Sequence, residues 1–140
     1  MVEFKAESEW IGNGTARIKI RKFNIDVTSP LEISDPDKAI APEEVFPGVL
    51  ASCILTTFLY LKDRMNIHLE KWSSNVEASL DVTQKEGFQY ISIHVHIFIK
   101  VPQNEKDKIP KIIDLSHKYC PISKAIKGNV NELVDFEFID

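Results

Sequence analysis

The pattern of hydrophobic and polar positions is dominated by one uncharged stretch, residues 45–61. Pro42, Glu43 and Glu44 precede it, and three charged residues follow it at positions 62–64. Proline suits the first turn of a helix, and acids at the start with bases at the end complement the helix dipole. The pattern therefore predicts one helix over residues 42–64, about six turns long. Because the uncharged part has no polar face, we expect the helix to be buried on every side.

The same stretch raises the alternative of a membrane span. A span requires ~20 predominantly apolar residues, whereas this stretch is slightly shorter and contains Pro47 and Gly48. Pro47 lacks the N–H that would bond to the carbonyl of Glu43, so we expect a kink or a loosened first turn there. We interpret the stretch as the central helix of a soluble core with no membrane contact. A chain of 140 residues has difficulty covering such a helix alone, which points to a partner subunit.

Alternation of hydrophobic and polar residues predicts strands on both sides of the long helix. The expected strands cover residues 2–10, 15–28, 69–83, 88–101 and 130–139. A glycine-containing turn at residues 12–14 joins the first two strands, and a turn at residues 84–87 joins the next two into a long antiparallel hairpin. The apolar face of this hairpin is expected to lie on the long helix.

Two shorter helices are expected near the end of the chain. Asn104 would cap a helix that runs to about Lys118 and bends at Pro110. A short helix over residues 121–127 would then stop at Gly128.

The order of these elements favours one α+β domain over residues 1–140, with an antiparallel sheet and helices on one side. Residues 28–41 are interpreted as loop, apart from a short strand piece at 31–33.

Composition and charge narrow the function classes. The net charge is −4 and the chain has no basic tract, which argues against nucleic-acid binding. The first ten residues contain no apolar signal region, so we expect a cytoplasmic protein. In that reducing compartment two cysteines are more often catalytic or inert than a structural disulfide.

The two cysteines are the first candidates for chemistry. Cys53 lies in the middle of the apolar helix, where burial raises the pKa of a thiol, so a reactive Cys53 needs a cation brought by the fold. Cys120 directly precedes Pro121 and would occupy the N-cap of the short helix, where free N–H groups favour a thiolate and lower its pKa. The residues alone therefore favour Cys120 over Cys53 as a reactive thiol.

The histidines offer a competing metal hypothesis. His94 and His96 share one strand face at a spacing that can hold zinc, but no third ligand stands out beside them. His117 and Cys120 are three residues apart and would form a metal site with Cys53 only if a continuous helix carried both, and Pro121 argues against that. We therefore assign neither a metal nor another cofactor from the sequence.

Two motifs resemble the OsmC/Ohr family. Pro42-Glu43, followed by Ala51-Ser52-Cys53, resembles the P-E helix of that family with its A-A-C motif, and the residues Cys120-Pro121-Ile122-Ser123 resemble its C-P-x-S motif. The glycine turn, the long hairpin and the last strand also occur in the order of the family. The resemblance implies an OsmC-like fold, in which antiparallel sheets pack on a long central buried helix within an intertwined homodimer.

The resemblance also implies a thiol-dependent peroxidase that reduces organic hydroperoxides. Cys53 matches the cysteine that attacks the peroxide, Cys120 the resolving cysteine, and Glu43 the glutamate that holds an arginine over the thiol. The family carries that arginine in the first hairpin, where this chain has Gly12; of Arg17 and Arg21 we choose Arg17. A dithiol reductant, lipoyl-type or similar, would reduce the resulting disulfide.

Apolar walls would suit an alkyl hydroperoxide, and Phe46 and Phe58 are the expected walls. An alternative stays open: an OsmC-like protein without efficient peroxidase turnover, which binds an apolar ligand or senses thiol oxidation.

Overall fold

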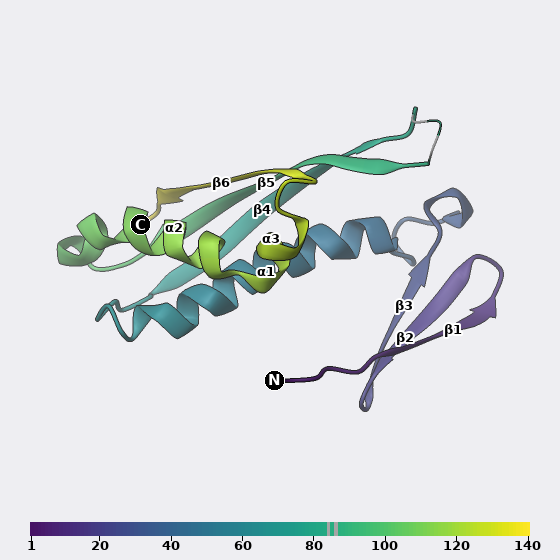
Figure 1. Ribbon diagram of the computed structural model, residues 1–140, viewed down its shortest axis with the longest axis horizontal. Coiled ribbons are helices and arrows are strands. Elements are labelled where there is room, and N and C mark those ends of the chain that lie inside the picture. The colour runs from purple at the N-terminus through teal and green to yellow at the C-terminus, as the bar shows by residue number, and fades with distance from the viewer. Residues whose placement is uncertain (84, 86) are drawn as a thin grey trace. The chain divides into compact units, whose positions relative to one another are not determined.

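The computed structural model describes residues 1–83, 85 and 87–140 (Figure 1). The chain divides into two compact units, Met1–Phe46 and Pro47–Asp140, and each contains a three-stranded sheet. Helices accompany the second sheet, so the predicted α+β class is confirmed. The single-domain organisation stays a prediction.

The first unit is a meander of three antiparallel strands, β1 (Glu7–Gly12), β2 (Thr15–Ile20) and β3 (Phe23–Thr28). Our single strand over residues 15–28 was wrong, because the chain turns at Arg21, whose φ of 55° belongs to the left-handed region. The first strand also begins later than predicted, at Glu7 rather than residue 2.

The first sheet has little core of its own. Among the described residues of this unit, Val27 and Ala41 are the buried hydrophobic side chains, whereas Trp10 and Phe23 are 78% and 55% exposed. A 3-10 turn, η1 (Pro30–Glu32), follows β3 where we expected a short strand at 31–33; proline at the start of the turn favours helical geometry over a strand.

The long helix is α1 (Pro42–Lys62), as the uncharged stretch predicted. At its start, the Ala41 N–H donates to Oε1 of Glu44 at 2.9 Å, one half of a capping box. The helix continues through Pro47, and the chain leaves it in a turn that places Asn66 at a φ of 53°. By length and composition α1 is also apolar enough to cross a bilayer.

The single chain does not bury α1 on every side. Pro47, Leu50, Ala51, Ile54 and Phe58 are buried. The opposite side of the helix is exposed, and it is still apolar or uncharged: Gly48, Val49, Ser52, Thr56, Leu59 and Tyr60. A single chain therefore covers one face of α1 and leaves a second apolar face uncovered.

The second unit contains β4 (Lys71–Asp81), β5 (Gln89–Lys100) and β6 (Asn131–Phe138), in that order across the sheet. The predicted antiparallel hairpin is confirmed as β4–β5. The turn that we placed at residues 84–87 includes positions 84 and 86, which lie outside the described residues. Strand β6 pairs parallel to β5, which corrects our all-antiparallel sheet.

The core of this unit lies between the sheet and its helices. Every second residue of β5 from Ile93 to Ile99 is at most 1% exposed. Figure 1 shows α1, α2 (Ile109–Tyr119) and α3 (Pro121–Ile126) on one side of the sheet. The ring of Phe58 on α1 lies 4.8 Å from that of Trp72 on β4, so α1 packs directly on the sheet.

The segment before α2 differs from our prediction. Asn104 caps no helix; it lies inside a 3-10 segment, η2 (Gln103–Lys108). The α-helix begins only at Ile109, which places Pro110 in the first turn. There its missing N–H costs no hydrogen bond, whereas a helix begun at Asn104 would need that donor. The short helix α3 and the stop near Gly128, at a φ of 83°, are as predicted.

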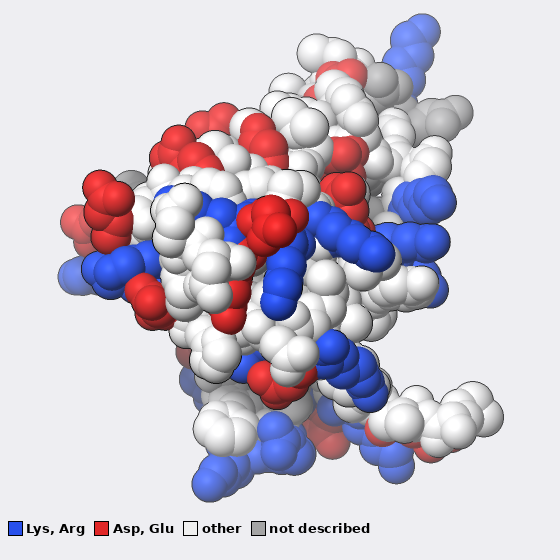
Figure 2. Space-filling view, turned by 90° about the vertical axis from the view of Figure 1, so that its left-hand side faces the viewer, with Lys and Arg blue, Asp and Glu red and all other residues white. Residues whose placement is uncertain are grey.

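Charged side chains of both signs lie on the surface among many uncharged ones (Figure 2). On the face drawn in Figure 2, lysines and arginines alternate with aspartates and glutamates and form no continuous area of one sign. The electrostatic potential of that face is therefore of mixed sign.

Candidate active site

The fold brings the two cysteines together, although 66 residues separate them in the chain. Cys53 lies on α1 and Cys120 at the N-cap of α3, and their side chains interact directly with each other. Both are free thiols; Cys120 is fully buried and Cys53 is half-buried. The pair lies within the second unit and joins the two motifs identified in the sequence.

The first turn of α3 supplies hydrogen bonds to both sulfur atoms. The Ser123 N–H donates to Sγ of Cys120 at 3.5 Å, which is the N-cap interaction that the Cys120-Pro121 sequence predicted. The N–H of Ile122 donates to Cys53 instead. Because the first N–H groups of a helix have no partners within it, the two sulfurs share donors that the helix itself leaves free.

Burial is the main influence on the Cys53 thiol, and it raises the pKa above its ordinary value. The neighbouring Cys120 thiol raises the pKa further. The N–H of Ile122 and the hydroxyl of Thr57 act in the opposite direction, because they stabilise the thiolate. Among the described groups that shift this pKa there is no cation, so the cation required by the sequence argument is not part of this environment.

Arg17 and Glu43 both belong to the first unit. Arg17 on β2 forms a bidentate ion pair with Asp26 on β3. Its Nε lies 2.8 Å from Oδ1 and its Nη2 lies 3.1 Å from Oδ2. This hydrogen bonding holds the pKa of Asp26 below its usual range. Glu43 lies half-buried in the first turn of α1. The roles assigned to these two residues by the resemblance stay predictions.

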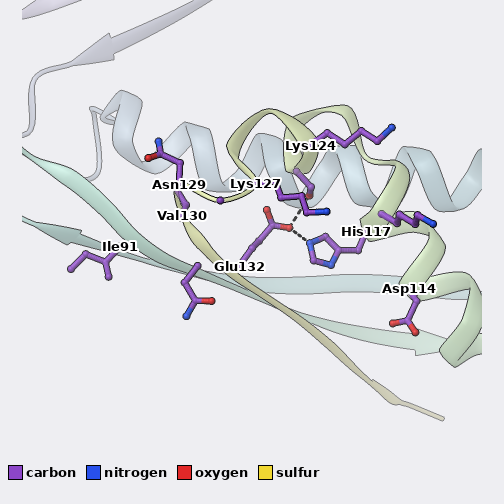
Figure 3. A pocket seen from close by; sticks show the side chains of 12 residues that line it. Ile91, Asp114, His117, Lys124, Lys127, Asn129, Val130 and Glu132 are labelled. Atoms are coloured by element: carbon purple, nitrogen blue, oxygen red, sulfur yellow. Dashed lines mark hydrogen bonds and ion pairs between the residues drawn. The ribbon is translucent and has the colours of Figure 1, made fainter.

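A second cluster connects to the cysteines through Ser123. Its hydroxyl donates to Oε2 of Glu132 at 2.8 Å, and the same carboxylate oxygen pairs with Nε2 of His117. Burial raises the pKa of Glu132, but the hydrogen bonds from His117 and Ser123 outweigh it and leave the pKa below its ordinary value. Figure 3 shows His117 and Glu132 pointing toward each other, from α2 and β6.

The sequence analysis did not identify this cluster. Glu132 was the available signal, because it is an acid on the inward face of a strand whose other inward residues, Val134 and Phe136, are apolar. An acid at such a position requires polar partners from the elements that cover the sheet. The ring of His117, which the sequence analysis considered as a metal ligand beside the cysteines, is paired with Glu132.

A pocket of about 880 Å³ lies against this cluster (Figure 3). It is lined by residues of α2, α3, the following loop and strands β5 and β6, among them His117, Ser123, Lys124, Lys127 and Glu132. Neither cysteine lines it. Phe58, one of our expected walls for the substrate, is fully buried against Trp72 and is not available to a ligand.

Comparison with known proteins agrees with the fold and the motifs. A family model described as OsmC-like protein matches residues 35–132. The organic hydroperoxide resistance protein OhrB from Bacillus subtilis is 22% identical over 109 residues, which cover 78% of each chain.

Two solved structures are similar to this one. An OsmC-like protein from Mycoplasma pneumoniae matches with a TM-score of 0.87 at 20% identity over 99% of both chains. The crystal structure of OhrB from Bacillus subtilis matches with a TM-score of 0.70 at 21% identity, over 96% of this chain and 98% of that chain. The family match spans well over half of the sequence and contains both cysteine motifs. The chain therefore belongs to the OsmC/Ohr family of OsmC-like proteins.

Proposed function

We propose that this protein is a thiol-dependent peroxidase that reduces organic hydroperoxides to alcohols. The observation that supports this most directly is the contact between Cys53 and Cys120, two thiols from distant parts of the chain. A peroxidase of this kind needs a second thiol beside the oxidised one, and family membership with organic hydroperoxide resistance proteins supports the same substrate class.

The proposed reaction has three steps. The Cys53 thiolate attacks one peroxide oxygen, the O–O bond breaks, and the alkoxide leaves and takes up a proton, so Cys53 becomes a sulfenic acid. The Cys120 thiol then displaces the sulfenic oxygen, which leaves as water, and a Cys53–Cys120 disulfide forms. An external dithiol, lipoyl-type or similar, exchanges with this disulfide, restores both thiols and becomes a disulfide itself.

The surroundings of the pair suit each step. The N–H of Ile122 stabilises negative charge on Cys53, first on the thiolate and later when the disulfide is reduced. Full burial of Cys120 protects the resolving thiol from direct oxidation. Arg17, held toward Cys53 by Glu43, is the proposed cation that offsets the cost of burial.

We further propose that the protein acts as a homodimer in the cytoplasm, without a membrane or nucleic-acid partner. Two features support a dimer: the exposed apolar face of α1, and the first sheet, which has few buried side chains. A second copy of the chain would bury both surfaces. Because Ser52, beside Cys53, lies on that exposed face, a partner helix there would form a wall of the substrate site.

A specific observation favours a second candidate, a thiol-oxidation sensor or ligand-binding protein without efficient turnover. Burial raises the pKa of Cys53, and a thiol with a raised pKa reacts slowly at neutral pH. Such a protein would form the disulfide over many minutes and would not consume peroxide catalytically.

Peroxide consumption separates the two candidates. Purified protein is mixed with cumene hydroperoxide and dihydrolipoamide, and peroxide loss is followed with time. The peroxidase predicts many turnovers per chain, no turnover in Cys53→Ser, and a slow rate in Cys120→Ser, where the dithiol must reduce the Cys53 sulfenic acid directly. Ser79→Ala is the control, since Ser79 lies at an exposed position of β4, outside both cysteine motifs.

Two results would contradict the peroxidase. Turnover that survives in Cys53→Ser would assign the activity to another group. Consumption of one peroxide per chain, with no further peroxide loss, would support the thiol-oxidation sensor instead.

A further inference from the structure

We propose that the outer face of the second sheet binds a divalent transition metal ion of the Zn²⁺ class through His94, His96 and Asp135. The two histidines come from the central strand β5, and Asp135 comes from β6. One donor atom from each of these three side chains lies within 4.8 Å of the other two. This site is separate from the cysteine pair and does not depend on the proposed peroxidase function.

The backbone fixes the three side chains on one face. Val95 and Ile97 are 1% and 0% exposed on the inner face, so the alternation of β5 directs His94 and His96 outward. In the parallel register between β5 and β6, Asp135 lies directly opposite His96. The parallel pairing, which the sequence analysis missed, therefore supplies the third ligand that the two histidines lacked.

The distances suit a metal ion. Oδ1 of Asp135 lies 3.0 Å from Nε2 of His94 and 2.5 Å from Nδ1 of His96. Zinc binds imidazole nitrogen and carboxylate oxygen at ~2.0–2.2 Å, which places tetrahedral ligand atoms about 3.3–3.5 Å apart. Both observed separations are shorter than that range, so the two imidazole rings must rotate away from Asp135, by up to about 1 Å, to admit an ion.

Neighbouring side chains orient the His96 ring. If Nδ1 of His96 binds the ion, its other nitrogen, Nε2, faces Oε1 of Glu137 at 3.8 Å. A carboxylate behind a ligating histidine is the usual outer-shell arrangement of zinc sites. The His96 ring also packs against the ring of Phe98 in a T-shaped arrangement, with 4.8 Å between the ring centres.

The site is accessible and chemically selective. The side chains of His94, His96 and Asp135 are 41%, 31% and 46% exposed, so an ion can enter from solvent and keep a water molecule as a fourth ligand. Two imidazoles with one carboxylate favour zinc-class ions over Mg²⁺ or Ca²⁺, which prefer oxygen ligands.

The test is a Zn²⁺ titration against a chromophoric chelator. It is done in a Cys53→Ser/Cys120→Ser background, because thiolates would bind zinc themselves. We expect one equivalent of Zn²⁺ per chain in this background. His96→Gln and Asp135→Asn should each weaken binding by at least about tenfold, the effect that loss of an outer-shell partner alone can produce.

The controls match the ligands by residue type. His68→Gln changes a histidine whose side chain is 79% exposed, and Glu70→Gln changes a carboxylate near the end of the sheet; both should bind zinc like the background. A second readout is thermal: Zn²⁺ should raise the Tm of the background and of both controls, but not that of Asp135→Asn. Absence of saturable binding, or equal affinity in the ligand variants and the controls, would overturn the proposal and leave a hydrogen-bonded cluster.

Discussion

Ser123 donates a hydrogen bond from its hydroxyl to Oε2 of Glu132 at 2.8 Å, and both side chains are almost completely buried. The backbone N–H of the same serine donates to Sγ of Cys120. Ser123 thus connects β6 to the buried thiol of Cys120. Its two hydrogen bonds, one from the backbone and one from the side chain, hold the first turn of α3 in place.

Removal of the Ser123 hydroxyl should destabilise the protein. In Ser123→Ala the buried Glu132 carboxylate loses one donor, which costs about 1–3 kcal/mol of unfolding free energy. Urea denaturation followed by circular dichroism measures the change. Ser79→Ala, at an exposed position of β4, should change stability by less than about 0.5 kcal/mol. Equal effects in the two variants would mean that the Ser123–Glu132 hydrogen bond contributes nothing to stability.

Cys120 should control the ionisation of Cys53. The Cys120 thiol raises the pKa of Cys53, so Cys120→Ala should shift the Cys53 titration to lower pH. Only the thiolate is alkylated, so at neutral pH the variant should react with iodoacetamide faster than the wild type. The rate is measured for the Cys53 peptide by mass spectrometry across a pH series. A midpoint that stays in place or moves upward would contradict the described contact.

Arg17 is predicted to lower the pKa of Cys53, and its removal should act in the opposite direction. In Arg17→Gln the alkylation midpoint of Cys53 should shift to higher pH than in the wild type, because burial would then raise the thiol pKa without a cation to offset it. Each unit of increase leaves about tenfold less thiolate at neutral pH, and peroxide consumption should fall in parallel.

Arg21→Gln is the matched control for Arg17→Gln. Arg21 lies in the turn after β2, where its guanidinium is 5.6 Å from the centre of the Phe23 ring, and it has no assigned role. If the pH dependence of Cys53 alkylation is the same in both variants and the wild type, Arg17 does not act on Cys53.

The exposed face of α1 should be the dimer contact. Val49 is 44% exposed in this chain, and a glutamate there would place an unpaired charge between two apolar helices. We expect Val49→Glu to sediment as a monomer under conditions where the wild type is a dimer. Ser79→Glu adds the same charge at an exposed position of β4 and should leave the dimer intact. A wild-type monomer at all concentrations would contradict the proposed assembly.

Much of the fold could be predicted because its strongest patterns are local. The uncharged stretch marked α1, and strict alternation marked β4 and β5. The direction of β6 could not be predicted, because side chains alternate in the same way in parallel and antiparallel strands. The break at Arg21 was also missed, although the apolar positions change from even to odd numbers after residues 21 and 22, because a non-glycine residue rarely takes the left-handed conformation found there.

Only part of the candidate site could be predicted from the sequence. The sequence Cys120-Pro121 predicted a thiol at the N-cap of a helix, and the family resemblance predicted that this thiol acts together with Cys53. Three features depended on tertiary structure and were missed: the Ile122 N–H at Cys53, the Ser123–Glu132–His117 cluster, and Asp135 beside the two histidines. Each joins residues from different elements, so no spacing along the chain could reveal it.

The most direct test of the central claim is to map the oxidised cysteines. Reduced protein is treated with one equivalent of cumene hydroperoxide, digested without reductant and analysed by mass spectrometry. The account predicts a Cys53–Cys120 disulfide within one chain, and a dimedone adduct on Cys53 when Cys120→Ser is treated in the same way. Two reduced cysteines after treatment, or a sulfenic acid on Cys120 that forms equally fast in Cys53→Ser, would contradict it.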